Sequence, residues 1–241
     1  MLTTPLLLIA IALTPAESFN QGNQDYSRND YPAAIAAYTL ALKDAPNPAV
    51  HYNIGNAYFK SGQIGRSVIE YHRAWLLAPR DNDVQTNLRF VRSYRVDKNL
   101  SLPSPVTILF DRAFHWLSLR EAALLAAIGF GLGALLFSLF IVFRKPFFLI
   151  TGIVALIPFL YGVVTAAVWQ TYRSSRPAVV VVSEANARSG PGEDYKDIVL
   201  IHDGTEIVIR ETRGDWLLVQ LPGGTGGWVK QDAGERIIPQ E

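Results

Sequence analysis

The stretch AALLAAIGFGLGALLFSLFIVF, residues 122–143, carries no charged side chain, and a second uncharged stretch, PFFLITGIVALIPFLYGVVTAAVW, occupies residues 146–169. Only Arg144 and Lys145 separate them. About 20 apolar residues of helix cross a bilayer core of about 30 Å, so each stretch is long enough to span it. A charge at the centre of such a helix costs roughly 3 kcal/mol, so its absence decides the interpretation. We predict a two-helix transmembrane hairpin whose flanking segments lie on one side of the membrane.

The rest of the chain leaves room for two small soluble domains, with about 100 residues before the hairpin and about 70 after it. The formal net charge of the 241 residues is +1, which gives no indication of nucleic acid or of an acidic partner. The chain has no cysteine, so disulfides, thiol catalysis and cysteine-ligated metals are excluded. The sequence therefore predicts a multidomain membrane protein.

Residues 1–16 have the pattern of an export signal. The run PLLLIAIAL at 5–13 has signal-peptide length, and Ala16 is a small residue suited to cleavage after it. No Lys or Arg precedes Arg28, so an uncleaved anchor or a misplaced start codon is the alternative. Positive charges around the spans would by themselves place the termini in the cytoplasm, but a translocated N-terminal domain fixes the later spans. We therefore expect both soluble domains to be extracytoplasmic.

Residues 17–97 repeat with a period of 33, which is typical of stacked helix-turn-helix units. We predict two units followed by a closing helix at 84–94. The glycines are expected where the first helix of a unit meets the second, the tyrosines between those helices, and the prolines where the second helix ends. The repeated pairs are Asn20/Asn53, Gly22/Gly55, Asn23/Asn56, Tyr38/Tyr71, Ala41/Ala74 and Pro46/Pro79.

The segments YPAAIAAYTLALKDAPN (31–47) and NIGNAYFKSGQIGRSVIEYHRAWLLAPRD (53–81) resemble tetratricopeptide repeats. The resemblance implies peptide binding on the concave face formed by the first helices, and asparagine amides suit a peptide backbone because they both donate and accept hydrogen bonds. Alternatively, Asn53 satisfies a helix end, and Tyr26 and Phe59 belong to the core. The predicted partner-binding residues on this face are Asn23, Tyr26, Asn53, Asn56, Phe59 and Lys60.

Residues 98–121 are interpreted as a linker followed by an interfacial helix. LSLPSP at 100–105 breaks the helical pattern, and the aromatic-rich amphipathic stretch that follows is typical of a helix at a membrane surface. Ser118 and Glu121 have the spacing of a capping box, which would begin the first span.

Small residues recur inside the hairpin. Gly129 and Gly133 form a GxxxG pair, and Gly162 and Ala166 form a looser one. Such spacing lets helix backbones approach closely, either between the two spans, which we favour, or against another membrane protein. Neither span contains a charge, so the sequence predicts no proton relay or ion path.

Residues 177–241 combine short strand-like runs with dense turn signals, which predicts a small all-β barrel. The stretch NARSGPGEDYKDIVLIHDGTEIVIRETRGDWLLVQLPGGTGGWVK, at 186–230, resembles a bacterial SH3 domain. The resemblance implies binding of cell-wall peptide or of protein rather than catalysis. We expect Tyr195 and Trp216 to line its groove. Trp216 and Trp228 are alternatively core residues, and for Trp228 we favour the core.

The whole arrangement resembles the BatE-type membrane proteins of bacterial aerotolerance operons. The resemblance implies a protein of the bacterial inner membrane with both soluble domains in the periplasm. It also implies partners among membrane-anchored von Willebrand A-domain proteins, beside a MoxR-type ATPase. It carries over no catalytic residue.

An enzyme is disfavoured by the distribution of reactive side chains. The four histidines, His51, His72, His115 and His202, are scattered, and HExxH, GxSxG and phosphate-cradling glycine motifs are absent from the sequence. We therefore expect no catalytic, cofactor or metal site. The leading hypothesis is a non-enzymatic membrane scaffold or adaptor that binds protein partners in a cell-envelope or stress-related complex. The alternative is a cell-wall sensor whose SH3-like domain binds peptidoglycan.

Overall fold

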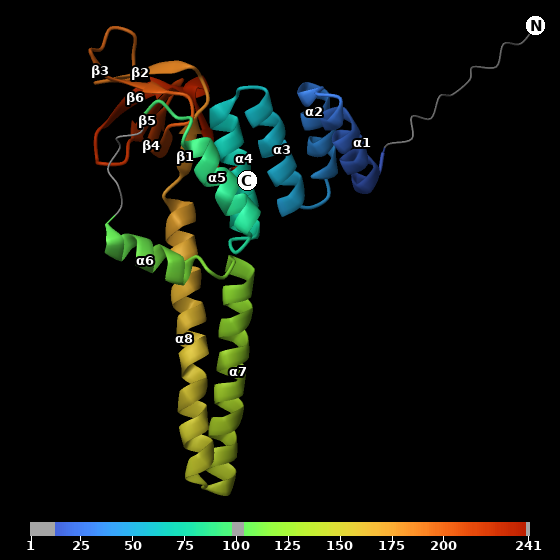
Figure 1. Cartoon of the computed structure of the whole chain (residues 1–241). Helices are drawn as coiled ribbons and strands as arrows, with labels where there is room; N and C mark the ends of the chain where they lie inside the picture. The colour runs from blue at the N-terminus through green and yellow to red at the C-terminus, as the bar shows by residue number, and fades with distance from the viewer. Residues whose placement is uncertain (1–12, 98–103, 240–241) are drawn as a thin grey trace, which may run out of the picture.

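The computed structural model describes residues 13–97 and 104–239. An α-helical N-terminal region, a pair of long apolar helices and a C-terminal antiparallel sheet confirm the predicted fold class. Figure 1 shows the helical region and the sheet close together at one end of the long helical pair. The first twelve residues of the predicted export signal lie outside the described residues, and the predicted cleavage point after Ala16 falls in the first turn of the first helix.

Side-chain caps begin most helices of the N-terminal repeat region. Thr14, Asp30 and Asn47 each accept a hydrogen bond from the first turn of the following helix, and each of these turns contains a proline, whose missing N–H costs nothing there. Asp81 caps the last helix in the same way. The helices are α1 (Pro15–Ser27), α2 (Tyr31–Ala41), α3 (Pro48–Lys60), α4 (Ile64–Leu77) and α5 (Asn82–Arg92).

In each two-helix unit of the repeat region, a glycine of the first helix packs against a tyrosine ring of the second helix. A Cβ atom at Gly22 would lie 2.5 Å from the Tyr38 ring, and one at Gly55 would lie 3.1 Å from the Tyr71 ring. Both tyrosines are buried. A larger side chain at either glycine would push the paired helices apart, so the predicted role of these residues is confirmed.

The helices α7 (Leu119–Phe143) and α8 (Pro146–Ser174) are long and apolar enough to cross a membrane. Only 11% and 17% of their most apolar windows are buried, so their apolar surface lacks protein cover among the described residues. The predicted capping box of Ser118 and Glu121 begins α7. Both helices extend past the predicted spans 122–143 and 146–169, and α6 (Pro105–Phe114) crosses beside α8 in Figure 1.

The two long helices pack on each other through small residues. A Cβ atom at Gly129 would lie 2.7 Å from the backbone nitrogen of Phe159, and one at Gly162 would lie 2.6 Å from the Ala122 carbonyl oxygen. Backbones this close leave no room for a larger residue, and such contacts drive helix association in lipid. The favoured interpretation of the glycines, contact between the two spans, is confirmed.

A cluster of aromatic side chains packs between the helical pair α7–α8 and the repeat region. Trp169 of α8 is buried and donates its indole N–H to the carbonyl oxygen of Leu117 at 2.7 Å. Its ring centroid lies 5.1 Å from that of Trp75 in α4 and 4.5 Å from that of His115, which follows α6. Aromatic contacts of this kind add about 0.5–1.5 kcal/mol each, so the cluster holds the three elements in one arrangement.

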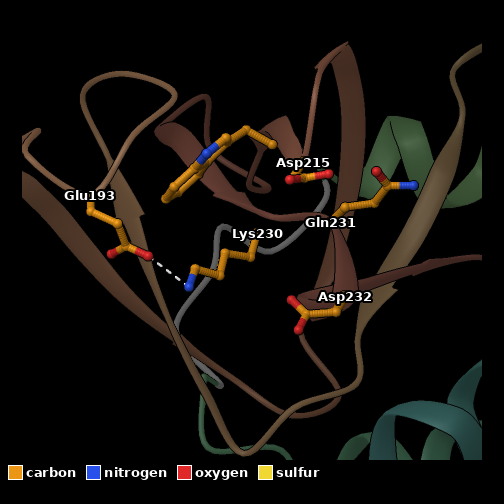
Figure 2. Close-up of a pocket in the computed structure, with 6 residues that line it drawn as sticks. Glu193, Asp215, Lys230, Gln231 and Asp232 are labelled. Atoms are coloured by element: carbon orange, nitrogen blue, oxygen red, sulfur yellow. Dashed lines mark ion pairs between the residues drawn. The ribbon is translucent and has the colours of Figure 1, made fainter.

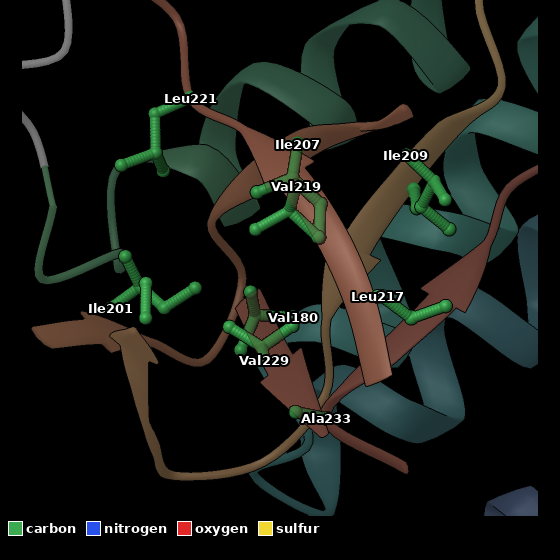
Figure 3. Close-up of a cluster of buried hydrophobic side chains, with 11 residues drawn as sticks. Val180, Ile201, Ile207, Ile209, Leu217, Val219, Leu221, Val229 and Ala233 are labelled. Atoms are coloured by element: carbon green, nitrogen blue, oxygen red, sulfur yellow. The ribbon is translucent and has the colours of Figure 1, made fainter. Parts of the chain in front are cut away.

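The C-terminal sheet domain is a seven-stranded antiparallel sheet in the order β3-β2-β6-β5-β4-β1-β7. Its core consists of buried aliphatic side chains from most of the strands, which Figure 3 shows as one cluster. The sequence analysis did not predict β2, which lacks an apolar run, or the three-residue β7. The strands are β1 (Pro177–Val180), β2 (Glu184–Arg188), β3 (Asp197–His202), β4 (Glu206–Arg213), β5 (Trp216–Gln220), β6 (Gly226–Lys230) and β7 (Gly234–Arg236).

The sheet domain caps a helix of the repeat region. Asp30 caps α2, but Gln63, one repeat later, makes no capping hydrogen bond for α4. Asp203 takes that place: its carboxylate accepts from the backbone N–H of Ile64 at 3.0 Å and of Gly65 at 2.9 Å. A carboxylate at a helix N-terminus satisfies donors and complements the helix dipole. The two domains therefore meet at an interface, called the joint below, where Asp203 of the sheet domain caps α4 of the repeat region.

A partly buried ion network closes the same joint. Glu206 of β4 accepts from His72 of α4 at 2.5 Å, from Arg92 of α5 at 2.6 Å and from Arg95 at 2.8 Å. Burial raises the pKa of Glu206, but the hydrogen bond from His72 and the charge of Arg92 outweigh it and hold the pKa well below the usual range. The carboxylate is therefore ionised in the joint.

Candidate functional site

The predicted asparagines of the concave face are tied to the buried tyrosines. The Tyr38 hydroxyl donates to Asn23 Oδ1 at 2.8 Å, and the Tyr71 hydroxyl donates to Asn56 Oδ1 at 2.5 Å. Asn53 donates to the same oxygen of Asn23 at 3.4 Å. Each carbonyl thus satisfies a hydroxyl of its own unit, which explains why the Asn and Tyr positions repeat together. The side-chain amide N–H groups of Asn23 and Asn56 remain the part that a peptide can use.

Replacing Asn56 with alanine is expected to destabilise the repeat region by about 1–3 kcal/mol, because the buried Tyr71 hydroxyl would lose its acceptor. Thermal unfolding of the full chain, followed by the helical signal, measures this change. The matched control is Asn53→Ala, which removes only a long hydrogen bond and leaves no buried group unsatisfied. Equal melting temperatures for the two variants would contradict the structural role of Asn56.

The remaining predicted residues of this face differ in surroundings. Tyr26 is half-buried and packs against a cluster of buried apolar residues that includes Ala34 and Tyr38, with its ring 5.5 Å from that of Tyr31. Phe59 is also half-buried, and its ring lies 5.5 Å from Phe90 and 5.0 Å from Tyr94, both of which are exposed. Lys60, at the end of α3, is exposed. Tyr26 and Phe59 therefore support the face from within, and Lys60 and the asparagine amides present polar groups.

The structure places Trp216 in a hollow of the sheet domain. Trp216 begins β5 and pairs with Lys230 of β6, so both side chains lie on the face opposite the aliphatic core. The hollow has a volume of about 740 Å³. Figure 2 shows Lys230 between Glu193 on one side and Gln231 and Asp232 on the other. Its wall thus combines one indole ring with groups that hydrogen-bond, as binding pockets for polar ligands do.

Charged side chains that the sequence analysis did not single out shape this hollow. Arg188 lies over the Trp216 ring, with its guanidinium carbon 5.7 Å from the centroid. Glu193 accepts from Lys230 at 2.6 Å and from Arg188 at 2.5 Å. The hydrogen bond from Lys230, then that from Arg188, lowers the pKa of Glu193. The available sequence signal was that Trp216 and Lys230 both lie in predicted strands; their pairing depends on the register of β5 with β6.

Tyr195 and Trp228 lie elsewhere. Tyr195 is half exposed and packs against Gly190, where a Cβ atom would collide with its ring, and it does not line the Trp216 hollow. The structure therefore does not bring Tyr195 and Trp216 into one groove, and a binding role for Tyr195 stays a prediction. Trp228 is 8% exposed, but it pairs with Leu218 on the outer face, while its neighbour Val229 points into the core.

Comparison with known proteins identifies the types of both domains. Residues 22–62 match the family model of the TPR repeat, and residues 183–234 match that of the bacterial SH3 domain. YrvJ of Bacillus subtilis (strain 168), provisionally named an N-acetylmuramoyl-L-alanine amidase, is 37% identical over 69 residues. That alignment lies in the SH3 region and covers 27% of this chain and 13% of YrvJ. The similarity therefore concerns a binding module and does not extend to the rest of that protein.

Proposed function

We propose that the protein is a non-enzymatic, membrane-anchored adaptor that binds protein partners in a cell-envelope or stress-related complex. The joint between the two domains carries this proposal. The Asp203 cap and the Glu206 network fix two binding modules as one head beside the apolar helical pair. A fixed head presents the concave repeat face and the Trp216 hollow at constant positions, which lowers the ordering cost of binding a partner.

The wider context of this proposal follows from the domain order. An SH3 domain of the bacterial type supports placement of the head outside the cytoplasm, in the periplasm if the N-terminal segment is an export signal. The resemblance to BatE-type proteins supports membrane-anchored von Willebrand A-domain proteins as partners. Both features belong to the proposal, and one experiment on intact cells and solubilised membranes tests them together.

The double variant Asn53→Ala/Lys60→Ala is expected to reduce recovery of the partner about tenfold or more, because it removes polar groups from the concave face without orphaning a buried group. A membrane-impermeant amine reagent should first label Lys60 in intact spheroplasts, as extracytoplasmic placement requires. Quantitative mass spectrometry of proteins that co-purify from solubilised membranes measures recovery. The control is Thr39→Ala/Lys43→Ala, two exposed positions at and just after the end of α2. Unchanged recovery of a von Willebrand A-domain protein would contradict binding by this face.

Peptidoglycan binding is the second candidate function. The observation in its favour is the similarity of the sheet domain to the SH3 region of YrvJ, whose name is that of an enzyme acting on N-acetylmuramoyl-L-alanine. The Trp216 hollow offers a ring face for a sugar and Glu193, Lys230 and Asp232 for peptide groups. Such a ligand would be held by stacking and by hydrogen bonds to ionised groups.

Trp216→Ala is expected to lower binding of the full chain to purified cell-wall sacculi about tenfold, because the variant removes the ring that forms the hollow. Sedimentation of the detergent-solubilised protein with sacculi measures the bound fraction. Ile198→Ala is the control, since Ile198 is an exposed apolar residue of β3 that does not line the hollow. Wild-type protein that stays in the supernatant would reject this second function and leave the adaptor proposal standing.

A further inference from the structure

A separate cavity lies where the repeat region meets the helical pair. It has a volume of about 780 Å³ and is walled by α4, α5, the end of α6 and the last turns of α8. In Figure 1 these elements lie near the end of α7 that is nearest the repeat region. The cavity contains neither the concave-face residues nor Trp216, so it is distinct from both candidate binding sites.

The wall of this cavity is rich in arginine. Four arginines line it, against one carboxylate, Asp111. Arg80 pairs with Glu121, and Arg92 pairs with Glu206. Within residues 13–97 and 104–239, neither Arg89 nor Arg112 has a carboxylate at ion-pair distance. Two guanidinium groups at the cavity therefore have charge left for an anion, and arginine binds phosphate oxygens through paired hydrogen bonds.

A buried histidine lies in the wall of the same cavity. His72 lines the cavity, and its side chain is 8% exposed. Nε2 faces Glu206, whereas Nδ1 has no hydrogen-bond partner among the described residues. Burial lowers the pKa of His72, which favours the neutral ring. Nδ1 has almost no accessible surface, so this atom is closed to the cavity, and the arginines are the groups that can bind an anion there.

The position of the cavity indicates which anion reaches it. The neighbouring helix α6 exposes Ile108, Leu109 and Phe110, and Trp116 and Tyr172 stand at the cavity itself. Exposed aliphatic side chains on a helix beside a span, with Trp and Tyr next to it, are the composition of a membrane–water interface. The cavity therefore lies where the charged headgroup of a lipid in the bilayer can reach it.

We propose that this cavity binds the headgroup of an anionic phospholipid, with its phosphate on Arg89 and Arg112. The proposal rests on membrane insertion of α7 and α8, which belongs to the proposed function. It assigns to the head a lipid contact that would hold the domains at a set height over the bilayer. Phosphatidylglycerol is the suitable probe because its phosphate gives the headgroup a net negative charge, whereas phosphatidylcholine is neutral overall.

The test uses the full chain in phosphatidylcholine nanodiscs with and without phosphatidylglycerol. Native mass spectrometry after release should show phosphatidylglycerol retained in at least tenfold excess over phosphatidylcholine. Arg89→Gln/Arg112→Gln should abolish this preference. Arg28→Gln/Lys43→Gln, which removes the same charge from the first repeat, should preserve it. Thermal unfolding of each variant checks that the fold is retained.

The outcomes separate the proposal from its alternatives. Equal retention of both lipids by wild-type protein would overturn the lipid site, as would an unchanged preference in the folded Arg89/Arg112 variant. Displacement of the lipid by free glycerol 1-phosphate at similar concentration would assign the site to a soluble phosphate instead. Failure of the chain to enter nanodiscs would contradict the membrane placement itself.

Discussion

Glu206→Ala is expected to lower the hydrogen-exchange protection of the Ile64 and Gly65 amides about a hundredfold. These amides donate to Asp203, so they exchange when the joint opens. Removing Glu206 leaves Arg92 and Arg95 facing each other beside His72 without their shared carboxylate. Breaking a buried ion pair costs about 3–5 kcal/mol, and the 23% exposure of Glu206 favours the low end of that range. About 3 kcal/mol corresponds to a hundredfold change.

The control for this experiment is Glu211→Ala, because Glu211 pairs with Arg213 where both side chains are well exposed. Such surface pairs contribute at most about 1 kcal/mol, and Glu211 does not touch the repeat region. Unchanged protection of Ile64 and Gly65 in Glu206→Ala would show that the network does not hold the joint. Loss of protection in both variants would point to general unfolding of the sheet domain.

The same network predicts how wild-type protection depends on pH. The folded pKa of His72 is lowered from 6.5, so stability is lost as the pH falls below 6.5, where the unfolded histidine binds a proton that the folded one does not. The folded pKa of Glu206 is lowered from 4.5, so a second loss begins below that value. Both shifts act in one direction, whereas burial raises the pKa of Asp203, which acts in the opposite direction. The shift of Glu206 is the larger one, so acid should open the joint. In Glu206→Ala the second loss should disappear.

Gly65→Ala is expected to destabilise the joint by about 2–4 kcal/mol, from overpacking together with loss of a helix cap. A Cβ atom at Gly65 would overlap the carbonyl oxygen of Val180 and a carboxylate oxygen of Asp203. The obstacle is largely backbone, so β1 would have to move away from α4. Alanine otherwise stabilises a helix by about 1 kcal/mol relative to glycine, so the expected sign is opposite to that of helix propensity alone.

Hydrogen exchange of the α4 amides in the full chain measures this effect. Gly131→Ala is a suitable control, because a Cβ atom at that helical glycine would meet no atom within 4 Å and the position lies far from the joint in sequence. Asp203→Ala should give a smaller loss than Gly65→Ala, since it removes the cap without a collision. Greater protection in Gly65→Ala than in wild type would mean that the two domains do not pack as described.

Part of the candidate site could be predicted from the sequence and part could not. Asn23 and Asn56 illustrate both cases. The 33-residue period predicted that Asn23 and Asn56 occupy equivalent positions, and the structure gives them equivalent tyrosine partners, because such a period maps equivalent positions onto equivalent surfaces. The repeat did not show that their side-chain carbonyl oxygens accept hydrogen bonds from Tyr38 and Tyr71. The sequence pattern of a polar residue on a helix face is the same whether its partner is a ligand or a neighbouring side chain. The sequence analysis predicted Trp216 as a groove residue. It did not predict the charged side chains around the ring, because their positions depend on the register of β5 with β6.

The sequence by itself determined the class of each segment, because hydrophobic runs and repeat periods are local properties of the chain. The uncharged stretches specified α7 and α8, and the turn-rich C-terminal region specified a small sheet domain. Only the tertiary structure decided that the two flanking domains form one head. His72 and Glu206 are 134 positions apart, and Gly65 and Asp203 are 138 apart. Each of these residues is ordinary in its local context, and their pairing arises because the helical hairpin returns the chain to its starting side.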